Sequence, residues 1–464
     1  MIMNIICALC IYPIIPFIYY CFKKSAVREK YVFGATLNSE AREDEEIKQL
    51  IEIYKKKLKK IFWILMIVPV VVIFIPYSSI TFTFWMFYLF AGMLVLALPY
   101  IRTNRLVMNY KYEKLGLGNL EENEENKKEI QVDLKSIATP EIKTGSMLIP
   151  TTISVVAAVV AMFSDNYHTA VSFVVVLFAV TTVIFHIVTK FMMVQKNEII
   201  CADSDININY SRALKKANQN YMFWLAMVNT FVTVAICISL LYDRNVESVI
   251  LWGGIFEAIV ACIFTIRIMK IRQKIDKAYM PYVEEELLGD DDIYWKYGLI
   301  YNNPKDKHSM VNARLGVGTT VNMAKPSGKI LAAIAIGSIA LCLFLGIFMM
   351  VEEFTPIHLK IKDDTISCIH TKEKYTIDID DIREITVLGE LPDMTKDIGT
   401  AMDNCYKGQF TESDTHDICK VLLNPQNDIF IRIKTDDNIY IISGYDDEET
   451  KQIYNQILYN METK

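Results

Sequence analysis

Long apolar runs separated by charged segments constrain this chain more than any other feature of its sequence. A helix needs about 20 apolar residues to cross the ~30 Å hydrocarbon core of a bilayer. Eight runs have this length or come close to it, at residues 2–22, 61–76, 82–101, 147–163, 169–189, 221–242, 249–268 and 330–351. The sequence therefore predicts an α-helical polytopic membrane protein with about eight transmembrane helices.

Two of these runs are short, and each contains a proline, Pro69 or Pro150. Neighbouring helices can satisfy the carbonyl groups that a proline frees in a membrane, so both runs stay in the prediction. The first run has neither a basic segment before it nor a small-residue cleavage site. We therefore expect it to be a retained helix and not a removed signal peptide.

The basic residues predict how the helices are oriented. The long connections, residues 23–60, 102–146, 190–220 and 269–329, together with Arg267, hold 35 of the 36 Lys and Arg residues that precede Glu352. The remaining one, Arg244, lies in a short connection. Positively charged loops stay in the cytoplasm, so the long connections are predicted there. Eight crossings then put both the N-terminus and the C-terminal segment on the extracytoplasmic side.

The C-terminal segment, residues 352–464, differs from the membrane domain, residues 1–351. It holds 24 acidic and 12 basic residues, a net charge of −12. Apolar and polar residues alternate in it, as in the series Ile366, Cys368 and His370. Similar alternation recurs around Tyr375, Ile377 and Ile379, then Ile429, Ile431 and Ile433, then Ile439 and Ile441. This period predicts half-buried strands, about seven in all.

The last residues predict a helix that closes this domain. Asp446 and Glu449 have the spacing of a capping box, and apolar residues recur at Ile453, Ile457 and Met461. Strands followed by a packed C-terminal helix resemble the bacterial pleckstrin-homology domains of multi-pass proteins. The resemblance lies in IHLKIKDDTISCIHTKEKYTIDIDDIREITVL, YKGQF and DIFIRIKTDDNIYIISGYDDEETKQIYNQI. Related domains bind anionic lipids, but the acidic charge argues against that use here. A protein or peptide partner, or packing on the membrane domain, remains as an expectation.

Other segments resemble an uncharacterised family of multi-pass membrane proteins from low-GC Gram-positive bacteria. They are VFGATLNSEAREDEEIKQLIEIYKKKLKK, NRLVMNYKYEKLG, DSDININYSRALKKAN and, most specific, the block of residues 290–328 before the last run. Some relatives carry a Pro-x-His motif shared with immunity and signalling proteins of a sporulation-delaying toxin system. This chain lacks that motif, and the resemblance implies no enzymatic activity.

We interpret the block of residues 290–328 as a cytoplasmic cap and not as a catalytic loop. We interpret Tyr294, Trp295, Tyr297 and Tyr301 as an aromatic surface at the headgroup interface. Three consecutive acids, residues 290–292, are interpreted as solvated residues at a helix start and not as a cation site. The GVGTT segment has no following Lys-Ser/Thr pair, so it does not predict a phosphate-binding loop.

Few ionisable residues lie inside the predicted spans. Glu257 is the clearest, and an intramembrane acid suggests either a functional site or a structural pairing. The neighbouring residues 253 and 254 are glycines, which permit close helix approach. Asn229 and His186 are the other polar candidates.

We expect no enzyme, cofactor, metal site or nucleic-acid partner, because no catalytic or ligand motif is present. Cys368, Cys405 and Cys419 are odd in number, which leaves either three buried thiols or one disulfide beside a free thiol. The favoured function is a regulatory, sensing or immunity-type role at the cell membrane through the extracytoplasmic domain. A secondary transporter that uses Glu257, and a scaffold without turnover, are the alternatives.

Overall fold

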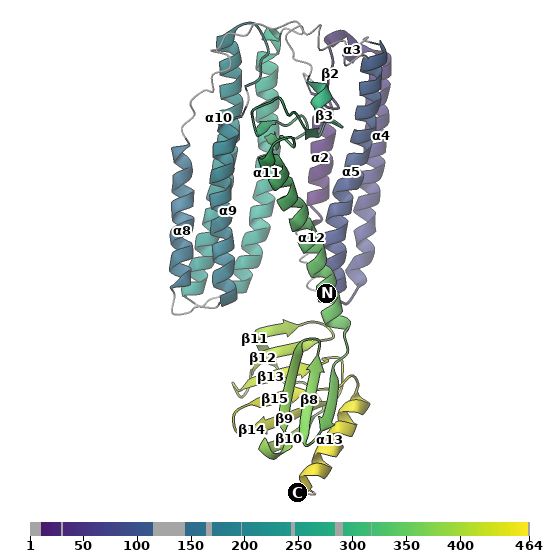
Figure 1. Ribbon diagram of the computed structural model, residues 1–464, viewed down its shortest axis with the longest axis vertical. Helices are drawn as coiled ribbons and strands as arrows, with labels where there is room; N and C mark the ends of the chain where they lie inside the picture. The colour runs from purple at the N-terminus through teal and green to yellow at the C-terminus, as the bar shows by residue number, and fades with distance from the viewer. Residues whose placement is uncertain are drawn as a thin grey trace. The chain divides into compact units, whose positions relative to one another are not determined.

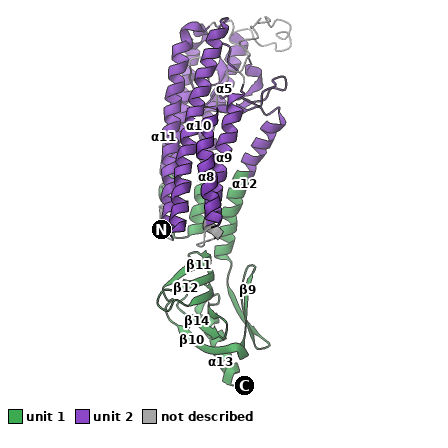
Figure 2. Ribbon diagram, turned by 90° about the vertical axis from the view of Figure 1, so that its left-hand side faces the viewer, with its two compact units in different colours: residues 1–8, 68–88, 338–464 green, residues 9–67, 89–337 purple. Residues whose placement is uncertain are grey.

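The computed structural model describes residues 11–28, 31–114, 144–163, 169–195, 197–242, 246–283, 291–316 and 318–462. The chain divides into two compact units (Figure 2). We call residues 9–67 and 89–337 the helical unit. Residues 1–8, 68–88 and 338–464 form the other, which we call the tail unit.

Helices, most of them long, make up most of the helical unit (Figure 1). They are α2 (Ile14–Ser25), α3 (Ser39–Glu43), α4 (Glu45–Ile67), α5 (Ser78–Lys114), α8 (Leu148–Met162), α9 (Thr169–Met193), α10 (Ser204–Leu241), α11 (Val246–Tyr279) and α12 (Pro326–Phe354). Helix α10 packs against α8, α9 and α11. Helices α5 and α12 continue into the tail unit.

Six of the described helices are long and apolar enough to cross a membrane, namely α5, α8 with the preceding turn, α9, α10, α11 and α12. They coincide with six of the eight predicted runs. The first run lies partly outside the described residues, and α2 covers its second half. The second run is divided, because α4 ends at Ile67 and a 3₁₀ helix, Val68–Phe74, contains Pro69. Proline disfavours helical conformation in the residue before it, which explains this end.

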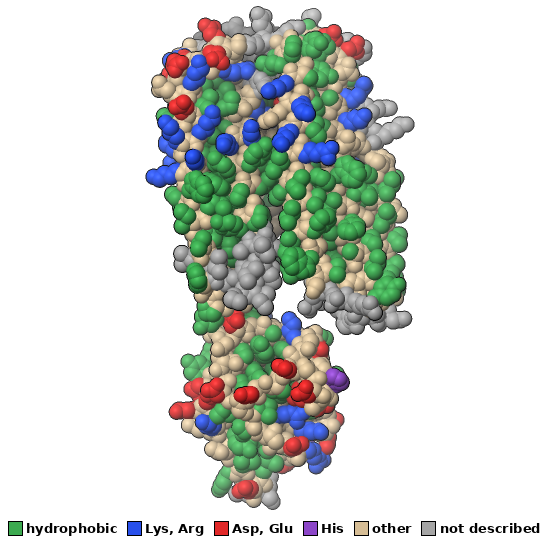
Figure 3. Space-filling model, turned by 180° about the vertical axis from the view of Figure 1, so that it is seen from behind, with side chains coloured by type: hydrophobic (Ala, Val, Ile, Leu, Met, Phe, Trp, Pro, Cys, Tyr) green, Lys and Arg blue, Asp and Glu red, His purple; other side chains and the backbone are tan. Residues whose placement is uncertain are grey.

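Several spans continue as helices into the segments that were predicted as loops. Helix α5 extends from the predicted end at Ile101 to Lys114, about 20 Å at 1.5 Å per residue. Helix α10 begins at Ser204 instead of Tyr221. Figure 3 shows hydrophobic side chains along the helices and Lys and Arg side chains gathered beyond them at one end of the helical unit. The change in surface chemistry matches the change from apolar run to charged extension.

Short hairpins fill the space between these extensions. The segment between α11 and α12 contains β3 (Trp295–Lys296), β4 (Ile300–Tyr301), β5 (Met310–Asn312) and β6 (Thr319–Val321), and the earlier hairpin contains β1 (Tyr31–Val32) and β2 (Ala35–Thr36). Each hairpin is antiparallel. We call residues 291–316 and 318–325 the cap.

Two sheets and a terminal helix form the C-terminal domain of the tail unit. The strands are β7 (His358–Lys362), β8 (Thr365–His370), β9 (Glu373–Asp378), β10 (Ile382–Leu388), β11 (Met394–Ala401), β12 (Tyr406–Glu412), β13 (Ile418–Leu423), β14 (Phe430–Thr435) and β15 (Ile439–Ile442), and the helix is α13 (Asp447–Glu462). One sheet has the order β7-β8-β9 and the other β10-β14-β15-β13-β12-β11. Strands β13 and β15 are parallel, and the other pairs are antiparallel. These nine strands exceed the seven or so that were predicted.

The alternating pattern is confirmed where one face of a strand is buried. In β8, the side chains of Ile366, Cys368 and His370 are buried, as predicted. In β14, neighbouring Phe430 and Ile431 are both buried, because the strand contributes to one core on each face of its sheet. The predicted cap of α13 is also confirmed, since Glu449 N donates to Asp446 Oδ1 at 2.8 Å.

The three cysteines of the domain are free and buried in the structure, so Cys405 and Cys419 are not paired. Burial raises the pKa of the Cys405 and Cys419 thiols to about 12. They are packing residues of the two cores and not reactive thiolates.

Candidate functional site

A polar network joins three of the helices that could span a membrane. Asn229 on α10 is buried, and its Nδ2 donates to Phe178 O at 2.7 Å and to Thr182 Oγ1 at 2.6 Å. Ser154 Oγ on α8 lies 3.0 Å from Thr182 Oγ1 and 2.8 Å from Thr230 Oγ1. These hydroxyl and amide groups satisfy one another between α8, α9 and α10. The arrangement is that of buried groups that hold helices together.

His186 lies one helical turn beyond Thr182, on the same face of α9. It is buried, and its Nδ1 lies 3.1 Å from Thr151 Oγ1 of α8. His186 therefore links α9 to α8 and Asn229 links α10 to α9, and each already has a hydrogen-bond partner.

Glu257 on α11 does not belong to this network. Its side chain is half-buried, and among the residues that the structure describes it has no hydrogen bond or ion pair. Gly253, one turn earlier, packs closely on α10, since a Cβ there would lie 2.8 Å from Val232 Cγ1. A Cβ on Gly254 would meet nothing within 4 Å. Close helix approach thus occurs at one of the two glycines.

The cap holds a buried ionic cluster that sequence reasoning missed. Asp292 and Arg314 are 3% and 2% exposed, and they form an ion pair. Lys111, near the end of α5, is also buried, and its Nζ lies 2.7 Å from Asp292 Oδ2. Asp292 also accepts from Thr36 N at 2.8 Å and from Thr36 Oγ1 at 3.0 Å. One carboxylate therefore links the cap to α5 and to the β1–β2 hairpin.

The electrostatic balance at Asp292 favours its ionised form. Burial alone would raise the pKa of this carboxyl, but the charges of Arg314 and Lys111 outweigh burial and hold its pKa below the ordinary range. Arg314 also donates to Gly34 O and lies over the rings of Tyr31 and Trp295, with its Cζ 4.6 Å and 4.7 Å from the ring centroids.

The interpretation of residues 290–292 as solvated acids was wrong for Asp292. Asp290 lies outside the described residues, and Asp291 is the partly exposed member that also contacts Arg314. Two aromatic residues of the cap were likewise misjudged, because Trp295 and Tyr301 are buried and pack on each other. They form the core of the cap, and Tyr297 is the exposed ring.

A second group of buried charges joins the cap to α10 and α11. Arg28 Nη2 lies 3.1 Å from Asp276 Oδ2, and Arg28 Nη1 donates to Ala313 O at 3.2 Å. Tyr210 OH donates to Asp276 Oδ1 at 2.9 Å. Arg272 Nη1 donates to Gly318 O at 3.2 Å. Four segments far apart in sequence are tied together here by charge-assisted hydrogen bonds.

Two tight turns, one in the β1–β2 hairpin and one in the cap, meet backbone to backbone. Phe33 and Gly34 have φ of 52° and 77°, and Tyr297 and Gly298 have φ of 58° and 66°. A Cβ on Gly298 would lie 2.6 Å from Phe33 O. Asn104 Nδ2 of α5 donates to the same carbonyl at 2.7 Å. Only glycine fits at such a contact, since its positive φ and its missing Cβ are both used.

Asn322 organises the second half of the cap. Its Oδ1 accepts from Asn303 N at 3.0 Å and from Ala324 N at 3.1 Å, and its Nδ2 donates to Asn303 O at 2.8 Å. Gly328, at the start of α12, packs directly on Asn322 O, where a Cβ would collide with the backbone. This turn closes the cap against the beginning of the last helix.

This part of the cap is what the chain shares with other proteins. Residues 304–329 match a family of unknown function (DUF5808). The match lies within and just beyond residues 290–328, the block that stood out in the sequence, and includes Arg314, Asn322 and Gly328. No curated protein and no solved structure shows significant similarity to the chain.

In the tail unit, acidic side chains tie the C-terminal domain to the ends of two helices. Asp403 Oδ2 accepts from Ser78 N and Ser78 Oγ, both at 2.7 Å, at the start of α5. Glu353 is 1% exposed, and it accepts from Ser79 N and from Asp403 N, both at 3.1 Å. Glu352 pairs with Lys407 of β12. We call Ser78, Ser79, Glu352, Glu353, Asp403 and Lys407 the clamp. It explains why residues 68–88 and the end of α12 belong to the tail unit, beyond the boundary predicted after Val351.

His370 makes the stability of the tail unit depend on pH. It is buried beside Cys405, and its Nε2 lies 3.1 Å from Thr355 O. Burial, aided by the charge of Lys407, lowers the pKa of His370 below its ordinary value. The unfolded chain then binds the proton more tightly, so stability is lost as pH falls below ~6.5, by at most ~1.4 kcal/mol per pH unit for one group.

We expect the purified chain to unfold at a lower temperature at pH ~5 than at pH ~7.5, and H370N to flatten this dependence. Carboxyl groups do not affect this comparison. For example, hydrogen bonds from Arg383 lower the pKa of Asp436, so this group changes the stability only near pH ~4 and below. H416N, at an exposed histidine, is the control and should keep the parent's slope. An unchanged slope in H370N would contradict the assignment.

Proposed function

We propose that this chain is a multi-pass protein of the cell membrane with a regulatory, sensing or immunity-type role. Its C-terminal domain would lie outside the cytoplasm and bind a protein or peptide. The clamp is the observation that carries the proposal. A domain joined only by a tether could not transmit the effect of ligand binding to the helices. Asp403 and Glu353 instead connect the domain to the ends of α5 and α12 by buried and half-buried charge-assisted hydrogen bonds.

The orientation rests on the basic residues. They occur almost entirely in the connections that carry the cap and the helical extensions, and such connections remain in the cytoplasm. If the first two apolar runs also cross the membrane, the total is eight crossings. An even number leaves the C-terminal domain on the same side as the N-terminus.

Cysteine labelling tests this orientation. Cys405 is unsuitable as a reporter because it is buried, but Tyr459 is 67% exposed and Ile53 on α4 is 47% exposed. A membrane-impermeant maleimide should label Y459C in intact cells, and should label I53C only after permeabilisation. The parent chain gives the background from native thiols. The reverse pattern would place the C-terminal domain in the cytoplasm.

We infer that the C-terminal domain is related to pleckstrin-homology domains. A three-stranded antiparallel meander, a second sheet and a closing helix support this relationship. The parallel pair β13–β15 departs from a purely antiparallel barrel. Strand β11 lies at one edge of its sheet and carries Ile398, which is 73% exposed. An exposed edge of this kind suits the addition of an extended peptide as a further strand.

Complementation tests the role of the clamp. The double variant E353Q/D403N should insert at the normal level but fail to restore the transcript profile of cells that lack the chain, because the domain can no longer bias α5 and α12. A chain ending before Ile357 should fail in the same way. D436N is the matched control, since it weakens an exposed ion pair with Arg383 elsewhere in the domain.

Glu257 distinguishes this proposal from secondary transport. The half-buried Glu257 has no partner among the described residues, which supports transport. Asn229 and His186 have partners on α8 and α9 instead and form no site with Glu257, which argues against transport. E257Q should restore the transcript profile as well as the parent does. Failure of E257Q together with full activity of the truncated chain would instead establish Glu257 as the functional residue.

A further inference from the structure

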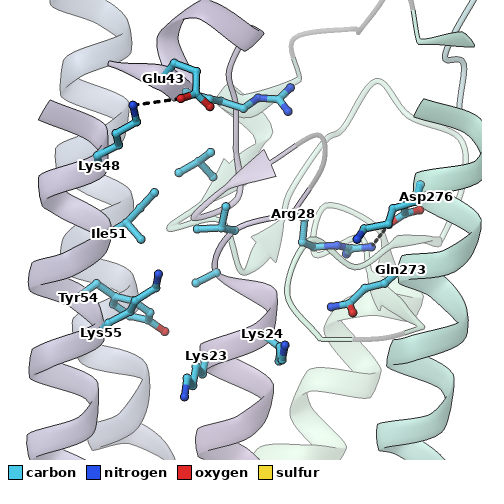
Figure 4. A pocket seen from close by; sticks show the side chains of 15 residues that line it. Lys23, Lys24, Arg28, Glu43, Lys48, Ile51, Tyr54, Lys55, Gln273 and Asp276 are labelled. Carbon is cyan, nitrogen blue, oxygen red and sulfur yellow. Dashed lines mark hydrogen bonds and ion pairs between the residues drawn. The ribbon is translucent and has the colours of Figure 1, made fainter. Parts of the chain in front are cut away.

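A cavity of about 730 Å³ lies in the helical unit between the end of α2, the first half of α4 and the end of α11 (Figure 4). Small apolar side chains, among them Ala26, Val27 and Val32, line part of it. The rest of the lining is polar and mostly basic. The volume is in the range of cavities that hold small-molecule ligands.

The charges around this cavity are strongly unbalanced. Seven basic side chains line it, namely Lys23, Lys24, Arg28, Arg42, Lys48, Lys55 and Lys277, against the two acids Glu43 and Asp276. Both acids already have cationic partners. Asp276 pairs with Arg28 at 3.1 Å, and Glu43 pairs with Lys48 at 3.1 Å, as the dashed lines in Figure 4 show.

Four of these lysines are available to neutralise the charge of a bound anion. Lys23, Lys24, Lys55 and Lys277 have no ion pair with any acid among the residues that the structure describes. They come from three different helices, α2, α4 and α11, and all line the same cavity. Like charges held together in this way repel one another, and a bound anion would relieve that repulsion.

The four lysines are exposed, but the base of the cavity between them is held in place by buried and half-buried contacts. The Arg28 side chain is 10% exposed and is held by Asp276 and by the carbonyl groups of the cap. Tyr54 is buried, and its hydroxyl donates to Phe22 O at 3.0 Å, which joins α4 to α2. The helices that carry the lysines are therefore fixed relative to one another.

The position along the helices indicates which anion can reach the site. Lys23 and Lys24 directly follow the first apolar run, so a membrane crossing by that run would place them at the depth where lipid headgroups begin. Basic pockets between membrane helices at such a boundary bind phosphate-bearing headgroups. The other end of the cavity, near Lys48 on α4, lies beyond the apolar runs and is reached from water.

We propose that this cavity binds a phosphate-bearing anion, held by Lys23, Lys24, Lys55 and Lys277. The phosphate belongs to an anionic lipid of the adjacent leaflet or to a soluble phosphate compound. Binding at this site bridges α2, α4 and α11 beside the cap. The proposal does not depend on a ligand of the C-terminal domain.

Binding to the full chain in neutral detergent tests the proposal. Fluorescent phosphatidylglycerol is titrated into the protein, and pyrophosphate is titrated in a separate arm by calorimetry. Fluorescent phosphatidylcholine serves as the uncharged lipid. The cavity variant K24Q/K55Q/K277Q removes one lysine from each helix. The control variant K56Q/K59Q/K274Q removes three lysines of α4 and α11 that are exposed like the cavity lysines but do not line the cavity.

We expect the cavity variant to bind the anionic probe about a hundredfold more weakly, and the control variant to bind it like the parent. Loss confined to phosphatidylglycerol identifies a lipid site, and loss confined to pyrophosphate identifies a soluble ligand. The proposal is overturned if the parent binds neither probe, if phosphatidylcholine binds equally well, or if both variants lose affinity to the same extent. Equal unfolding temperatures of the two variants exclude misfolding as the cause.

Discussion

The variant D292N is expected to lose about 3–5 kcal/mol of stability, because it leaves two buried cations without their shared carboxylate. Arg314 and Lys111 are almost fully buried, and both contact Asp292. Neither can reach water without opening the cap. Thermal unfolding of the purified chain, and proteolysis within the cap, should both show the loss.

The neighbouring variant D291N is the control for this prediction. Asp291 also contacts Arg314, but its side chain is 38% exposed, so water can replace it and the cost should stay near ~1 kcal/mol or below. The double variant D292N/K111M should recover part of the loss, since it removes one of the two buried cations that Asp292 neutralises. Equal effects of D291N and D292N would show that the buried ion pair does not stabilise the cap.

The variant G298A is expected to cost roughly 3 kcal/mol or more, because a Cβ there would collide with the backbone of the β1–β2 hairpin. The contact is with Phe33 O, at 2.6 Å from the added carbon, and Gly34 Cα lies 3.1 Å from it. A backbone atom cannot rotate away as a side chain can. The two hairpins would have to separate, and the bond from Arg314 to Gly34 O would be lost with them.

The variant G316A is the control for G298A, because it carries the cost of the left-handed backbone conformation without a collision. Gly316 has φ of 74°, and a Cβ on it would meet nothing within 4 Å. Alanine there pays only for the left-handed conformation, about 1 kcal/mol. Thermal unfolding of both variants gives the comparison. If G298A and G316A were equally stable, close contact between the hairpins would play no part in the stability of the cap.

The apolar helices were the part of this fold that could be read from the sequence. Six candidate spans fall on six predicted runs because about 20 consecutive apolar residues are a local property of the chain. The end of α4 at Ile67, within the second run, was not predicted, although Pro69 is the residue that causes it. The helical extensions were hidden too, because their charged residues resemble those of a loop.

The candidate site was harder to predict. Polar residues inside apolar runs, such as Asn229 and His186, can be found because they interrupt a pattern. Asp292 interrupts nothing, since it stands in a row of acids that is typical of exposed chain. Its partners Lys111 and Arg314 are distant in sequence, and no local rule connects them.

Similar reasons divide the predictions for the C-terminal domain. Alternation marks β8 because one of its faces is buried, and the capping residues mark the start of α13. Strand β14 shows no clean alternation because it is buried on both faces. The parallel pairing of β13 with β15 joins strands that are not consecutive, so it follows from the packing of the whole sheet.

Hydrophobicity and charge are carried by single residues and short runs, so the sequence alone specified the membrane class, the basic and acidic segments and the strand-rich end of the chain. Ion pairs, backbone contacts and cavities require partners from distant segments. Tertiary structure therefore decided that Asp292 is buried, that Gly298 packs on Phe33, that the clamp joins the C-terminal domain to two helices, and that four lysines line one cavity.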